Sequence, residues 1–182
     1  VLSIGGISGY SKAMAKFRIN KTMDQISMLV MNIRTLFSGS MDYTGLKNSL
    51  AVQLGVIPGE MIVGTNKTSG STLINAYQGG VRVKAGDVGG DNRSFTIQYA
   101  GLSREGCIAL ATADWGSQAG SGLIGIALNT SDNVGELVDE DDLVSSPETG
   151  KYTVDDLPIT LSAATAQCAV AEGLKTITWY YY

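Results

Sequence analysis

The fold of this chain is decided by its first 37 residues, VLSIGGISGYSKAMAKFRINKTMDQISMLVMNIRTLF, which have the pattern of one long helix. Residues 1–9 are uncharged, apolar and rich in small side chains. Beyond them, apolar residues recur alternately four and three positions apart, which keeps them on one stripe of an α-helix. The members of this stripe are Ile19, Met23, Ile26, Val30, Ile33 and Phe37. We expect the stripe to pack the helix against the rest of the protein.

Basic side chains follow the apolar start of this helix. Residues 1–34 carry five of the 13 Lys and Arg residues but one of the 17 Asp and Glu residues, within a formal net charge of −4. An apolar start with a basic collar suits a membrane interface or an acidic neighbouring subunit, although a solvated helix face would carry the same charges. We expect a longer hydrophobic helix to continue upstream into a membrane or a filament core. Nucleic-acid binding is not expected, because the acidic remainder would repel phosphates.

The pattern beyond residue 37 predicts an antiparallel sheet interleaved with short helices, which is an α+β fold. A chain of 182 residues fits one domain, with residues 1–37 as the helix and 38–182 as the globular head. The expected strands are 81–85, 94–99, 123–128 and 175–182, and the expected helices are 44–54, 103–115 and 162–172. The Gly- and Asn-rich segment 63–80 is expected to be an exposed loop, and 86–93 a hairpin loop.

No motif in the chain predicts catalysis or a cofactor. The sequence contains no histidine, which removes the commonest general base and zinc ligand, and it has no Walker loop or dinucleotide fingerprint. An acidic cluster at 139–142, together with Asp155 and Asp156, has oxygen ligands that suit Ca²⁺. This cluster lacks the spacing and the glycine of an EF-hand, so a solvated loop is the preferred interpretation. We therefore expect no enzyme, no cofactor and no metal site.

Cys107 and Cys168 are the only cysteines, and each falls in a predicted helix with apolar neighbours. They are either two separate buried thiols or one disulfide, whose loop of about sixty residues would be worth roughly 4 kcal/mol in the loop-entropy model. The even count, beside a membrane-proximal helix, favours export and oxidation. At the C-terminus, residues 179–182 form an aromatic run that we expect to bury one face as an alternating strand.

Three segments together resemble the type IV pilins, specifically the type IVb branch that includes bundlin and the PilS-like pilins. They are the helix SKAMAKFRINKTMDQISMLVMNIRTLF, the segment CIALATADWGS and the ending AATAQCAVAEGLKTITWYYY. Their order, with one cysteine in each of the last two, carries the resemblance over essentially the whole chain beyond residue 10.

This resemblance implies an αβ-roll, in which a long N-terminal helix lies against an antiparallel sheet. It implies that Cys107 and Cys168 form the disulfide that bounds the family's D-region, which is exposed on the filament. It also implies a structural subunit of a surface pilus used for adhesion, aggregation or conjugative contact. The implied partners are other copies of the chain in a helical filament, the inner membrane and the pilus assembly machinery. The head would face the periplasm before assembly and lie in an extracellular pilus afterwards.

The start of the chain departs from the family pattern. It lacks the leader peptidase site, the methylated N-terminal residue and the glutamate at position five of mature pilins. Residues 1–9 would then correspond to the end of the helical half that is buried in the filament. We expect the missing part to lie upstream and to be the membrane anchor.

Two other functions fit parts of the same pattern. A minor pilin or a type II secretion pseudopilin would share the helix and the sheet but would initiate or tip a short filament. A glycan-binding module would instead use the Gly- and Asn-rich segments 63–80 and 86–93. The size of the chain and its cysteine-bounded region favour the pilin over the smaller major pseudopilins.

Overall fold

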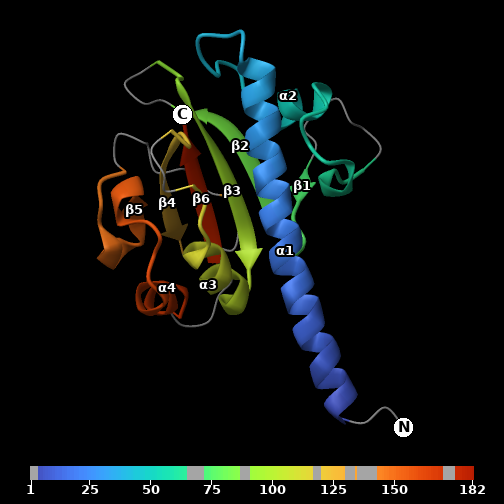
Figure 1. Ribbon diagram of the computed structural model, residues 1–182. Helices are drawn as coiled ribbons and strands as arrows, with labels where there is room; N and C mark the ends of the chain where they lie inside the picture. The colour runs from blue at the N-terminus through green and yellow to red at the C-terminus, as the bar shows by residue number, and fades with distance from the viewer. Residues whose placement is uncertain are drawn as a thin grey trace.

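The computed structural model confirms the expected α+β roll. Its described residues are 4–64, 72–86, 91–116, 120–129, 134, 143–169 and 175–182. Helix α1 (Ile4–Phe37) is 34 residues long and lies across one face of a six-stranded antiparallel sheet (Figure 1). Its N-terminal half extends beyond the edge of the head, and the helices α3 and α4 lie together near that edge.

The last strand of the chain lies in the middle of the sheet. Its strands are β1 (Leu73–Ile74), β2 (Gly80–Gly86), β3 (Ser94–Leu102), β4 (Leu123–Asn129), β5 (Lys151–Thr153) and β6 (Lys175–Tyr181), in the spatial order β1-β2-β3-β6-β4-β5. Strand β6 is therefore central, with Trp179 opposite Ile97 of β3 and Ile126 of β4. The two halves of the sheet are joined through the C-terminal strand, because β6 hydrogen-bonds to β3 on one side and to β4 on the other.

Three short helices follow the predicted positions with tighter bounds. They are α2 (Asn48–Gln53), α3 (Arg104–Thr112) and α4 (Leu161–Cys168), and single 3₁₀ turns occupy Gly59–Met61, Pro147–Thr149 and Val154–Asp156. The start of α3 is capped by Ser103, whose Oγ accepts a hydrogen bond of 3.1 Å from the Gly106 N–H. This is the N-cap expected of a serine at that position.

The core lies between α1 and the sheet, and its largest members are aromatic. Trp179 is fully buried and meets Tyr99 and Trp115 edge to face, with ring centroids 5.9 Å and 5.1 Å apart. Phe95 stacks on Tyr181 at 5.6 Å. Such pairs add to the burial of apolar area, so this cluster stabilises the packing of β3, β6 and Trp115 against one another.

Two sequence-based expectations about the sheet are wrong. The final strand does not bury one face: all of β6 is buried, because Tyr180 packs on the face opposite α1 with Leu143 and Ala127. The segment 63–80 is not wholly an exposed loop either, since Leu73 of β1 is 1% exposed and bridges to Ile62. A two-residue strand is too short for alternation to reveal it.

We predict that Ile33→Asp unfolds the domain. The Ile33 side chain is fully buried in the core, so an unpaired carboxylate there costs several kcal/mol, comparable with the whole stability of a small domain. Circular dichroism melts would measure this, with Ser27→Asp as the matched control on an exposed position of the same helix. A soluble Ile33→Asp variant with a cooperative melt would contradict the assignment.

A second prediction concerns alkaline pH. Burial, offset in part by Arg34, raises the pKa of Tyr181 to about 12, whereas an unfolded tyrosine titrates near 10. Between these values only the unfolded chain releases the proton, so stability is lost as pH rises, by about 2 kcal/mol. Urea unfolding at pH 9 and at pH 11.5 should show a smaller loss for Tyr181→Phe. Tyr10→Phe, at an exposed position, should behave as the wild type, and equal losses in all three proteins would refute the prediction.

Candidate assembly surface

The six residues of the predicted stripe on α1 differ in how deeply they are buried. Ile26 and Ile33 are fully buried in the main core, and the partly buried Met23, Val30 and Phe37 pack against that core. Ile19 is half-buried, at a surface groove formed with α3 and α4. The contact between α1 and the core is therefore continuous from Met23 to Phe37, and the side chains of α1 become more exposed towards its N-terminus.

Sequence reasoning missed three buried residues on this side of α1. Leu29 is fully buried, and so are the polar residues Thr22 and Gln25. Leu29 lies three residues after Ile26 and four before Ile33, so the helical period places it beside them. The buried face of α1 is therefore wider than the single stripe of residues spaced alternately four and three apart.

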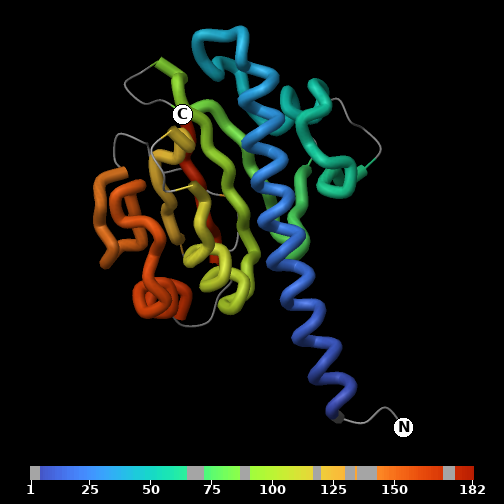
Figure 2. Tube along the Cα trace, viewed as in Figure 1, coloured from blue at the N-terminus to red at the C-terminus, as the bar shows by residue number. Residues whose placement is uncertain are grey.

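The N-terminal half of α1 carries exposed apolar side chains on its other side. Ile7, Tyr10 and Phe17 are 59%, 69% and 56% exposed. Phe17 precedes Ile26 by nine residues, which at 3.6 residues per turn is two and a half turns, so the two side chains point in opposite directions. Tyr10 lies seven residues before Phe17, which is close to two full turns, so both side chains lie on the same side of the helix. Figure 2 shows that the tube of α1 leaves the head well before its N-terminal end. The helix thus presents one apolar side to the sheet and another to its surroundings.

The basic collar overlaps the exposed apolar part of the helix, since Lys12 and Lys16 lie between Tyr10 and Phe17 in sequence. Lys12, Lys16 and Arg18 are exposed, and Lys21 pairs with Glu60 at 3.2 Å. A backbone hydrogen bond, assisted by Lys21, lowers the pKa of Glu60. Within the described ranges, Lys21 is the one collar residue that has an ion-pair partner. Three cations therefore remain available to an acidic surface outside the molecule.

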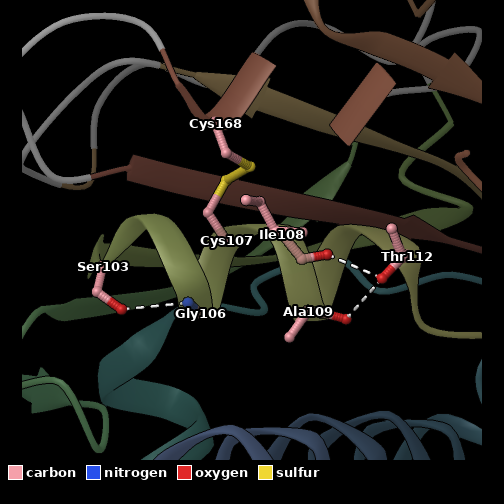
Figure 3. Close-up of a disulfide and its surroundings, with 7 residues drawn as sticks. All are labelled: Ser103, Gly106, Cys107, Ile108, Ala109, Thr112 and Cys168. Carbon is pink, nitrogen blue, oxygen red and sulfur yellow. Dashed lines mark hydrogen bonds between the residues drawn. A yellow bond between two sulfur atoms is a disulfide. The ribbon is translucent and has the colours of Figure 1, made fainter. Parts of the chain in front are cut away.

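The disulfide joins two helices at the lower end of the head. Cys107 on α3 and Cys168 at the end of α4 are bonded, with their Cα atoms 5.9 Å apart and a sequence separation of 61 (Figure 3). Both sulfurs are buried, and α3 itself packs against α1. The bond therefore ties the segment that contains β4 and β5 back to the long helix.

No metal-binding group of His, Cys, Asp or Glu occurs in the part of the chain that the structure describes. The acidic residues 139–142 lie outside that part. Asp156 is engaged locally, since its carboxylate accepts hydrogen bonds of 2.9 Å from both the N–H and the hydroxyl of Thr153. Among the described helices, none is sufficiently long and apolar to span a bilayer.

Comparison of the sequence with models of known protein families shows to which family the chain belongs. A family model described as PilS N terminal matches residues 16–181. The chain belongs to the PilS N-terminal family. The match includes the core side of α1, both cysteines and the central strand β6 of this PilS-family chain. No curated protein sequence matches it.

Solved pilin structures share the fold of this PilS-family chain. A type IVb pilin from Salmonella typhi has a TM-score of 0.59 and 20% identity, over 91% of this chain and 98% of that one. TcpA, a type IV pilin from the El Tor biotype of Vibrio cholerae, has a TM-score of 0.56 and 14% identity, over 91% and 99%. The NMR structure of PilS from Salmonella typhi has a TM-score of 0.53 and 19% identity, over 90% and 95%. The chain therefore has the type IVb pilin fold.

We predict that the disulfide of this PilS-family chain forms in protein exported to an oxidising compartment. Cys107→Ala/Cys168→Ala should lower the free energy of unfolding by roughly 4 kcal/mol, because the unfolded chain regains the freedom of the closed loop. Thiol titration of the denatured wild-type protein, without reductant, should find no free thiol. Two titratable thiols, or equal stability of wild type and variant, would contradict this prediction.

Proposed function

We propose that this chain is a structural subunit that polymerises into a type IVb pilus. The observation that carries the proposal is the second apolar side of α1, at Tyr10 and Phe17, on a helix that projects from a PilS-family head. Large apolar side chains that remain exposed on a folded subunit mark a surface that another molecule covers. Copies of the same chain supply such a surface along the axis of a filament.

The geometry of the helix suggests how the subunits associate. The head contacts α1 from about Ile19 onward, so the exposed side chains before it are available to pack against the same part of neighbouring copies. Burying one Phe or Leu side chain contributes about 2 kcal/mol, and every subunit would bury several. Head-to-tail contacts that do not close into a ring generate a helical polymer.

The basic collar supports a membrane-bound stage before assembly. Lys12, Lys16 and Arg18 are exposed directly after the apolar start of α1, where anionic lipid headgroups would meet them. We propose that an apolar helix upstream anchors the subunit in the inner membrane, with the head in the periplasm. The pilus assembly machinery would then transfer that helix from lipid into the filament. The disulfide is consistent with this oxidising compartment.

Immunogold electron microscopy of native cells, with antibody raised against this domain, tests the proposed function. Label along the length of filaments is the expected result and identifies a major subunit, of a pilus that we propose serves adhesion, aggregation or conjugative contact. Label confined to filament tips, or to the envelope of cells without filaments, would instead assign the chain as a minor pilin or a pseudopilin.

We further predict that Phe17→Glu abolishes filaments without unfolding the head. The Phe17 side chain is 56% exposed, so the change costs the isolated subunit little, whereas burial of the carboxylate between copies costs several kcal/mol. Piliation by electron microscopy and the melting temperature of the purified domain are the two measurements.

Val144→Glu is the matched control, because Val144 is 67% exposed and does not lie on α1. It should leave both piliation and melting temperature unchanged. Normal filaments from the Phe17→Glu strain would show that this side of α1 is not an assembly surface.

A further inference from the structure

A groove lined by positive charge opens on the face of the sheet that is turned away from α1. Its volume is about 640 Å³, and it lies between the start of α2 and the outer side of β2. Three cationic side chains line it: Lys47, Arg82 and Lys84. The two lysines are exposed. This is a local concentration of positive charge on a chain whose formal net charge is −4.

The backbone places these cations on the same side of the sheet. The Ala85 N–H donates a 3.0 Å hydrogen bond to the Leu46 carbonyl, and Lys47 forms an antiparallel bridge with Lys84. Leu46 is buried in the core, so alternation directs Lys47 to the opposite, outer face. Arg82 lies two residues before Lys84 on β2 and therefore shares that face.

The wall of the groove is held in place by one side chain. The Nδ2 of Asn48 donates to the Val81 carbonyl at 2.9 Å, and its Oδ1 accepts from the Val83 N–H at 2.7 Å. Asn48 thus replaces a neighbouring strand where β1 has ended. The backbone at Lys47 is therefore held in place before any ligand binds, which lowers the entropic cost of binding.

Two of the three cations lie opposite each other, Lys47 on the loop before α2 and Lys84 on β2. Like charges directly opposite each other on neighbouring strands destabilise a sheet. On the other side of β2, Lys84 faces the neutral Thr96. The ion pairs found in the described part of the chain, Lys21–Glu60 and Arg93–Asp91, involve neither Lys47 nor Lys84. An anion held between these two lysines would remove their repulsion.

We propose that this groove binds the sulfate or carboxylate groups of an acidic polysaccharide. The volume falls within the roughly 300–1,000 Å³ typical of small-molecule sites, which suits a few sugar rings. Three cations on an acidic chain are too few to favour the continuous phosphate backbone of a nucleic acid. The groove faces away from α1, so assembly through α1 would leave it accessible, and the site does not depend on the proposed function.

Calorimetric titration of the soluble chain at low salt tests the proposal. The probes are a heparin hexasaccharide, which carries sulfate and carboxylate, and a carboxylate-only oligogalacturonate of the same length. Lys47→Gln/Lys84→Gln should weaken binding of the wild type's preferred probe about tenfold, and that probe identifies the anionic group. The same variant should melt about 1 °C higher than the wild type, because the repulsion between the two lysines is gone.

Lys12→Gln/Lys16→Gln, which removes two exposed charges from α1, is the matched control and should bind as the wild type does. The proposal is overturned if neither probe binds saturably to the wild type, or if the groove variant binds as tightly as the wild type. It is also overturned if the α1 control loses the binding. Equally tight binding of a single-stranded DNA oligonucleotide would replace the polysaccharide with a nucleic acid as the ligand class.

Discussion

The burial of one side of α1 against the sheet is the interaction on which the rest of the structure depends. Ile26, Leu29 and Ile33 are fully buried there, beneath a sheet whose central strand contains Trp179. Because this contact joins the first helix to the last strand, the chain must be nearly complete before the core can form. The same contact becomes weaker before residue 22, and residues 5–13 of α1 are all exposed.

That division gives one helix two roles. Between Met23 and Phe37, the apolar side chains on the buried side of the helix stabilise the head. Before residue 18, Tyr10 and Phe17 remain more than half exposed, and the contacts that we propose for them are with other copies. The exposed basic residue Lys16 lies beside them on the same part of the helix. The disulfide between α3 and α4 supports the arrangement, since α3 packs against α1.

Much of this fold follows from the sequence because its signals are local. The helical period over 11–37 and the serine before α3 predict elements that the structure contains. Sheet order is different, because alternation within 175–181 cannot reveal that two other strands flank it. Strand β1 is too short to give a pattern. The cationic groove was also invisible in the sequence, since Lys47 and Lys84 meet only through the pairing of residues 46–48 with β2.

Helical reconstruction of native filaments by electron cryomicroscopy would show both sides of α1 in the assembled pilus. We expect Tyr10 and Phe17 to pack against the helices of neighbouring subunits at the filament axis. We also expect the face of the sheet turned away from α1 to lie on the filament surface. A reconstruction with the N-terminal half of α1 solvated on the outside, or with the sheet turned to the axis, would contradict these expectations.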